Sequence, residues 1–190
     1  MFDEEFYKEE TFSGLSPEEL RLSGTEFYKC VFEKCAFSKA VFADVRFEKC
    51  RFINCDMSLS RFDKSELIDA ELSGCKLIGI DWSLIRGNLQ AEFVNCKLDN
   101  SSFYGLSLKQ LKMTGCSAVD TDFETADLSK ANLSGTDFLR AKFNEANLSG
   151  ADLTEARNYS INPARTKIKK AKFSLPEVLT LLDIYDIVLK

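Results

Sequence analysis

Seven cysteines are the most reactive side chains in this sequence, and their spacing limits the chemistry they can perform. Five of them recur every 20 or 21 residues, at Cys35, Cys55, Cys75, Cys96 and Cys116. Such thiols suggest disulfides, a redox role or a metal site. However, the sequence has no histidine as a further ligand, and parallel side chains do not favour the disulfide dihedral angle. We expect buried, reduced, structural thiols, with a metal or redox role as the alternative.

Other groupings that carry catalysis are missing from the sequence. Without histidine there is no histidine-based acid–base pair or triad. No glycine-rich phosphate-binding loop is present. The many carboxylates fall on outward positions of a regular repeat, where a solvated face is the ordinary outcome. We therefore expect no enzyme activity, no cofactor and no metal, and a function carried by a surface.

A ladder of apolar residues must position these side chains. Nearly every fifth residue is large and apolar from Phe27 to Trp82 and, after a slip of one residue, from Phe93 to Leu153. Residues five apart on an α-helix are separated by roughly 140°, and odd steps along a strand alternate faces. Neither element keeps the whole ladder in one core. The chain must turn after each five-residue unit, which predicts an all-β solenoid.

A second ladder supports the same unit. The large apolar residue is the centre of each five-residue unit. The residue two before each centre is small or β-branched, as in Ala131-Asn132-Leu133-Ser134-Gly135, with Leu106 and Leu111 as the oversized exceptions. All seven cysteines occupy this inward position. Because Trp82 and Phe93 are eleven residues apart, one extra residue must be absorbed between Ser83 and Glu92. We expect a bulge there, around residues 85–88.

The units at residues 126–135 and 146–153 match the pattern A-[DN]-[LF]-x-x position by position. The chain thereby resembles the pentapeptide-repeat family over about residues 23–157. The resemblance implies a right-handed quadrilateral β-helix with four units per coil, hence between six and seven coils. With one inserted residue, the five recurrent cysteines would stack on one face and Cys30 and Cys50 on the adjacent face.

Both ends depart from the repeat. Residues 1–22 are expected to form a short cap, because Ser16-Pro17-Glu18-Glu19 is typical of a helix start. Residues 158–190 are expected to form an irregular final coil, an α-helical cap and an apolar tail. One coil end does not easily bury so many apolar side chains, so we predict a two-fold homodimer; the alternative is a monomer whose tail caps its own rod. The expected interface residues are Val178, Leu179, Leu181, Leu182, Ile184 and Ile187, followed by Val188 and Leu189.

Composition indicates a cytoplasmic protein that does not enter a membrane. No apolar run approaches a membrane span, and the acidic N-terminus lacks the pattern of a signal peptide. The net charge of −5 disfavours direct nucleic-acid binding. Residues 118–156 hold eight acids against three bases. These acids, which we expect to contact a partner, are Asp120, Asp122, Glu124, Asp127, Asp137, Glu145, Asp152 and Glu155.

Rod length and the apolar C-terminal segment look similar to the quinolone-resistance (Qnr) branch of the pentapeptide-repeat family. Members of that branch are dimeric rods that bind DNA gyrase or topoisomerase IV and protect them from inhibitors. The resemblance implies a DNA-mimic-like rod that competes with DNA for a type II topoisomerase and confers antibiotic resistance by protecting it from quinolone-type inhibitors. The alternative is a generic protein-interaction scaffold without topoisomerase activity.

Overall fold

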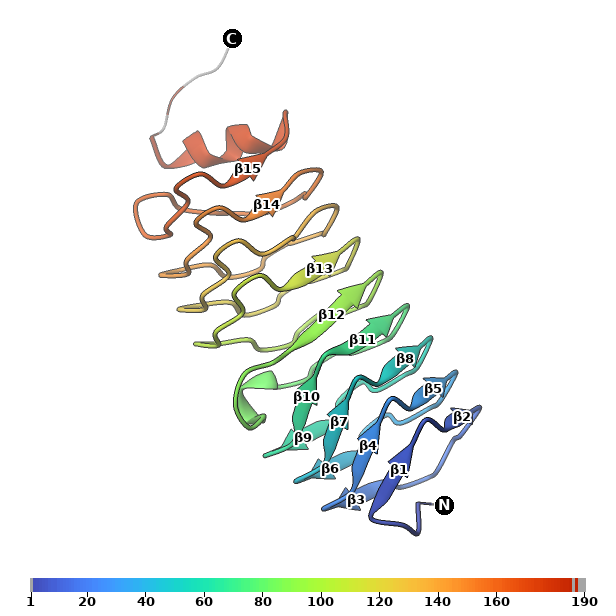
Figure 1. Cartoon of the computed structure of the whole chain (residues 1–190). Coiled ribbons are helices and arrows are strands. Elements are labelled where there is room, and N and C mark those ends of the chain that lie inside the picture. Colours follow the sequence, from blue (N-terminus) through green and yellow to red (C-terminus); the bar gives the residue numbers. More distant parts are fainter. Residues whose placement is uncertain (1, 186, 188–190) are drawn as a thin grey trace.

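The protein winds into a parallel β-solenoid of about 8 turns, as the computed structural model shows (Figure 1). Residues 2–185 and 187 are described. Paired strands are separated by one coil of about twenty residues, so that Phe27 lies beside Phe47 and Phe47 beside Leu67. The expected right-handed quadrilateral β-helix is confirmed. The number of turns is larger than predicted, because coiling begins before residue 23.

Three sides of the rod contain β-strands, and each strand pairs in parallel with the strand of the neighbouring coil on the same side. The first side, called the β1 side, stacks β1 (Phe6–Lys8), β4 (Glu26–Tyr28), β7 (Arg46–Glu48) and β10 (Glu66–Ile68). The β2 side stacks β2 (Thr11–Ser13), β5 (Val31–Glu33), β8 (Arg51–Ile53), β11 (Ala70–Ser73), β12 (Ala91–Val94) and β13 (Lys112–Thr114). The β3 side stacks β3 (Arg21–Ser23), β6 (Val41–Ala43) and β9 (Arg61–Asp63).

Isolated bridges continue the same columns to the end of the rod. The fourth side, called the bridge side, consists of such contacts from Ala36 to Arg157. Bridges extend the β1 side from Ser107 to Lys167 and the β3 side from Asp81 to Lys142. Near the C-terminus, β14 (Asp152–Leu153) pairs with β15 (Lys172–Phe173) and extends the β2 side.

The corners between sides are made by one residue per unit with positive φ. Lys29, Lys34 and Lys39 mark three successive corners, with φ of 54°, 52° and 61°. The left-handed conformation reverses the backbone locally, which lets an inward side chain recur every five residues. Glycine fills some corners, but most hold residues with side chains, so the turn is imposed by the stacked coils.

In the core, the large apolar residue of each five-residue unit stacks on the equivalent residue of the neighbouring coil. Phe47 is 1% exposed, and its ring lies 5.2 Å from that of Phe27 with an interplanar angle of 9°. The small inward residue often donates a hydrogen bond to the carbonyl of a centre in the coil below. Cys55 Sγ donates to Phe32 O at 3.3 Å, and Ser60 Oγ donates to Phe37 O at 2.7 Å. Cysteine, serine and threonine therefore suit this position because each satisfies a buried carbonyl.

Residues 6–23 form a first coil where the sequence predicted a separate cap. Strands β1, β2 and β3 pair with β4, β5 and β6. The expected helix start at Ser16 is wrong, because residues 15–20 contain no helix. The end of the rod is instead covered by Phe2, whose ring packs against those of Tyr7, Phe12 and Phe27.

The extra residue lies where the sequence predicts it, but its form differs. The 3-10 helix η1 (Trp82–Leu84) begins the segment, capped by the side chain of Asp81. Across it the strand partners Ala70 and Ala91 are 21 residues apart. Ile85 and Leu89 are buried and anchor the loop between them.

The C-terminal cap is a 3-10 helix, η2 (Glu177–Tyr185), rather than the α-helix expected. The Leu179 N–H bonds to Pro176 O, three residues earlier, and the Thr180 hydroxyl donates to Glu177 O. Figure 1 shows η2 lying across the last coil, at the opposite end of the rod from β1. No helix in the described part of the chain is long and apolar enough to span a membrane. Val188 and Leu189 lie outside the described residues.

Candidate partner-binding surfaces

The eight acids expected to contact a partner are distributed around the rod. Asp122 and Glu124 lie on the β3 side, and Asp120 and Glu145 occupy its two bounding corners. Asp127 lies on the β1 side, Asp137 on the bridge side and Asp152 on the β2 side, with Glu155 at the following corner. Four of the eight thus gather around one side, and the other four do not form a continuous stripe with them.

Five of these acids are paired with a base in a neighbouring coil. The guanidinium of Arg140 donates to both carboxylate oxygens of Asp120 at 2.6 Å, which lowers the pKa of Asp120. Arg157 lies 3.1 Å from Asp137, and Lys172 lies 3.1 Å from Asp152. Weaker pairs join Asp122 to Lys142 at 4.0 Å and Asp127 to Lys109 at 3.5 Å. In the described structure Glu124, Glu145 and Glu155 have no ion pair.

Several of the acids also stabilise the coil itself. Asp122, Asp127, Asp137 and Asp152 each accept the backbone N–H two residues later, at 2.9–3.2 Å. These are Asx turns, in which a short side chain substitutes for a backbone acceptor. Hydrogen bonds from Thr154 and then Lys172 lower the pKa of Asp152. Aspartate at this position of the unit therefore has a structural role independent of any partner.

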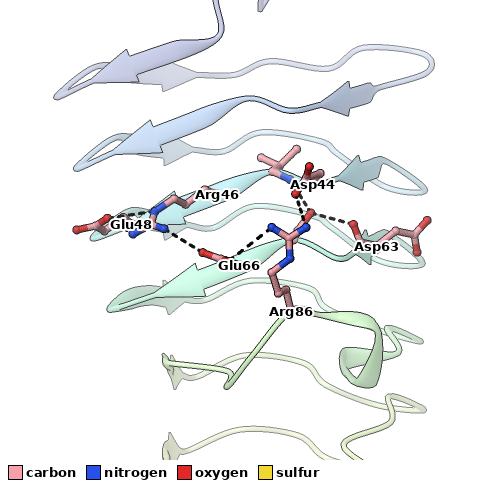
Figure 2. A network of polar contacts seen from close by, with 8 residues as sticks. Asp44, Arg46, Glu48, Asp63, Glu66 and Arg86 are labelled. Carbon is pink, nitrogen blue, oxygen red and sulfur yellow. Dashed lines mark hydrogen bonds and ion pairs between the residues drawn. The ribbon is translucent and has the colours of Figure 1, made fainter.

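A network of charged side chains surrounds the inserted segment. Arg46 bonds to Glu48 at 2.8 Å and to Glu66 at 3.1 Å. Arg86, from the insertion, lies 2.7 Å from Asp44 and 3.9 Å from Glu66 (Figure 2). Figure 2 shows the Arg86 side chain extending past the layer of Glu66 toward Asp44, with Glu66 between the two guanidinium groups. The network fixes the loop and leaves its charges mutually satisfied.

The cysteines are free and fully buried, in the two predicted columns. The Cys55 N–H donates to Cys75 Sγ at 3.4 Å, and the Cys96 N–H donates to Cys116 Sγ at 3.4 Å. Burial raises the pKa of the Cys50 thiol to about 12. Buried thiols with a raised pKa are poor nucleophiles. Within the described residues there is no group of three or more His, Cys, Asp or Glu that could hold a metal ion.

The C-terminal cap exposes apolar side chains. Leu175 is 76% exposed and Tyr185 62%, and Leu179, Ile184 and Ile187 are also exposed. Val178, Leu181 and Leu182 are half-buried, and Leu181 packs against the core. An open groove of about 400 Å³ separates the cap from the preceding coil, lined in part by Phe143, Ile161 and Ile184. The expected interface residues therefore divide into a half-buried set and an exposed set.

The pairing of charges was not anticipated from the sequence. It follows from the register, because Asp120 and Arg140, Asp137 and Arg157, and Asp152 and Lys172 are each 20 residues apart. A search for opposite charges at that spacing would have found them.

Solved structures share the overall fold of this chain. Two trypsin-treated variants of QnrB1, described as a plasmid-mediated fluoroquinolone resistance protein, superpose with TM-scores of 0.65 and 0.66 at 19% and 23% identity. The superpositions cover 97% and 98% of this chain and 100% and 90% of the variants. Full-length QnrB1 superposes with a TM-score of 0.57 at 18% identity, covering 96% of this chain and 100% of QnrB1.

Sequence comparison points to the same architecture. No curated protein matches the chain by sequence. The profile of the family described as "Pentapeptide repeat region" matches residues 25–86 and 89–174, which is more than half of the chain. Together with the five-residue units and the 20-residue register, this match shows that the chain belongs to the pentapeptide-repeat family.

Proposed function

We propose that this chain is a non-catalytic, cytoplasmic rod that binds a type II topoisomerase, DNA gyrase or topoisomerase IV, and protects it from quinolone-type inhibitors. The observation that carries the proposal is the end-to-end correspondence with a fluoroquinolone resistance protein, over 97% of this chain and 100% of the other. The buried, hydrogen-bonded thiols are consistent with a rod that acts through its surface.

The contact surface that we propose is the acidic group around the β3 side, Asp120, Asp122, Glu124 and Glu145. Glu124 and Glu145 have no ion pair among the described residues, so their charge is available to a basic partner. Asp120 and Asp122 face Arg140 and Lys142, which reduces their contribution. The structure therefore favours a local acidic contact over mimicry of a whole DNA duplex.

A gyrase supercoiling assay tests the proposal directly. We expect micromolar protein to restore supercoiling in the presence of a fluoroquinolone, and the substitutions Glu124→Gln and Glu145→Gln together to weaken this protection at least tenfold. The matched control is Glu18→Gln with Glu19→Gln, which removes two exposed carboxylates from the first coil. Absence of both inhibition and protection would contradict the proposal and favour a scaffold with another partner.

We also propose that the rod forms a homodimer through the exposed part of its C-terminal cap. The exposed side chains of the cap would be covered by the same side chains of a second copy; they are Leu175, Leu179, Ile184, Tyr185 and Ile187. A two-fold interface of this kind is self-complementary and closed. Burial of apolar surface would supply the driving force.

Size-exclusion chromatography with light scattering measures this directly. We expect a particle of twice the 21.5 kDa chain mass. Replacement of Leu179 and Ile184 by Ser should give a folded monomer, whereas Leu59→Ser, a matched change of an exposed leucine in mid-rod, should leave the dimer intact. A parent protein that elutes as a single chain at all concentrations would remove the dimer.

A further inference from the structure

Several exposed lysines in the described part of the rod, four of them without an ion pair, lie on one side of it. We define the lysine face as the outward positions of the β1 side after the insertion, at Lys109, Lys130, Lys167, Lys169 and Lys170. All five are exposed. The other outward residues of these four coils are Ser107, Gln110, Asp127, Ser129, Asn147, Ser149 and Gly150, so a single acid stands among five bases.

This surface breaks the charge pairing seen elsewhere on the rod. Arg157 and Lys172, in the same part of the chain, each have an aspartate 20 residues earlier. The residues 20 positions before Lys167, Lys169 and Lys170 are instead Asn147, Ser149 and Gly150. Lys109 pairs with Asp127 at 3.5 Å, but Lys130, Lys167, Lys169 and Lys170 have no ion pair to any described carboxylate. Four cations therefore remain available to an external anion.

The backbone holds these lysines in neighbouring layers. The Lys130 N–H donates to Ser149 O at 2.9 Å, and the Gly150 N–H donates to Lys169 O at 2.8 Å. The side chain of Lys130 lies across Gly150, with its Cγ 3.6 Å from the position that a Cβ of Gly150 would occupy. Since stacked strands are about 4.8 Å apart, the backbones at Lys130 and Lys170 are separated by roughly 10 Å. The lysines thus share one side of the rod in successive layers.

We propose that the lysine face binds the phosphate backbone of double-stranded DNA, weakly and without sequence preference. Lysine, serine and asparagine, which make up most of this face, are among the residues that contact DNA phosphates. Protein–protein interfaces are depleted of lysine and serine and enriched in aromatic residues, so the composition favours DNA over a protein partner. On and beside this face the five lysines outnumber two acids, Asp127, which is paired with Lys109, and Glu145 at the bounding corner, so the surface is locally basic although the whole chain is acidic. This binding goes beyond the proposed contact with a topoisomerase, which uses the β3 side.

Fluorescence anisotropy with a labelled DNA duplex of about 20 base pairs tests the proposal. We expect the protein to bind the duplex at low salt. A plot of the logarithm of the association constant against the logarithm of the salt concentration should have a slope of about −3 to −4, as four phosphate contacts require. Replacement of Lys130, Lys167, Lys169 and Lys170 by Gln should weaken binding at least tenfold and flatten this slope. The matched control replaces Lys8, Lys39, Lys64 and Lys97, four exposed lysines elsewhere, and should change affinity less than twofold.

Three outcomes would overturn the proposal: no duplex binding by the parent protein at low salt, an equal loss in the control variant, or tighter binding to a poly-glutamate peptide or to phosphatidylserine vesicles than to DNA. Circular dichroism confirms that the variants are folded. The fluoroquinolone protection assay separates the two proposals, since the lysine variant should still protect gyrase while failing to bind free DNA. If protection fails and duplex binding persists, only the topoisomerase proposal is lost.

Discussion

The Nη2 atom of Arg86 lies 2.7 Å from Oδ1 of Asp44, although the coil that contains Lys64 separates the two residues. The inserted segment thus ties three layers together. We predict that Arg86→Ala lowers the free energy of unfolding by about 0.5–1 kcal/mol, because both partners are more than half exposed. A double-mutant cycle with Asp44→Ala should show a coupling of a few tenths of a kcal/mol or more.

Amide hydrogen exchange gives a second measure of this contact. Exchange at residues 83–90 should accelerate in Arg86→Ala, because the loop loses a side chain that holds it to the rod. Arg21→Ala removes an exposed arginine at another place and serves as the control. A coupling of zero with unchanged exchange would mean that the ion pair does not fix the loop.

Phe47→Ala should be strongly destabilising. The ring is buried, lies parallel to that of Phe27 and contacts those of Phe42 and Phe52 edge-on. Loss of these contacts together with the cavity should cost about 3–5 kcal/mol. Urea unfolding followed by circular dichroism measures the change, and Phe6→Ala, at a half-exposed site, should cost far less. Equal effects at the two sites would contradict the stacked core.

Cys55 should tolerate substitution by serine better than by alanine. Its Sγ donates to Phe32 O, and Ser60 makes the equivalent bond to Phe37 O from the same position of its unit. Alanine leaves that buried carbonyl without its donor, at a cost of about 1 kcal/mol, whereas serine keeps one. Thermal unfolding of the two variants compares them, and a larger loss for serine than for alanine would refute the role of the donor.

Gly74→Ala should be more disruptive than Gly135→Ala. Both glycines have positive φ, 63° and 66°, so alanine is strained at each by about 1–2 kcal/mol. At Gly74 the new methyl group would also overlap Oδ1 of Asn54, whereas at Gly135 the nearest atom is 3.7 Å away. The overlap should add about 1 kcal/mol or more. Urea unfolding measures both, and Asn54→Gly in the Gly74→Ala background should remove the difference.

Tyr159 should make the protein less stable at alkaline pH. Its hydroxyl is buried and has no hydrogen-bond partner in the described structure, and burial, aided by Glu177, raises its pKa to about 12. The neutral form is favoured in the folded state, so its stabilisation is complete below the unfolded pKa of about 10 and is lost as pH rises toward 12.

Urea unfolding between pH 8 and pH 11 tests this. Tyr159→Phe should match the parent at pH 8 and lose less stability at pH 11. All other titratable groups are the same in both proteins, so the difference between the two curves isolates the tyrosine. Identical curves would show that Tyr159 does not titrate with unfolding.

The repeat made the fold predictable, because the spacing of the apolar centres is incompatible with an α-helix or a flat strand. The same phase also continues through Phe2, Tyr7, Phe12, Pro17 and Leu22. The helix-start pattern at Ser16 competes with this phase and favours a cap, which is why the sequence alone does not reveal the first coil. The phase slip was located correctly, but a 3-10 helix with a buried anchor cannot be distinguished from a bulge by counting residues.

The candidate site was less predictable than the fold. A run of acids in the sequence looks like one cluster, yet consecutive units point to successive sides of the rod. Asp127 and Asp137 therefore lie on different sides although only ten residues separate them. The lysine face is hidden in the sequence for the opposite reason. Lys130 and Lys170 are distant in the sequence but lie at the same corner of the rod, two coils apart.

The paired charges have a consequence for how the coils find their register. A coil closed one unit early or late would still bury an apolar centre at every level, so the interior alone does not distinguish correct from shifted winding. Asp120 meets Arg140, and Asp152 meets Lys172, only when a coil contains its full four units. The ion pairs on the outer surface thus specify the number of units in each coil, while the apolar interior stabilises the rod.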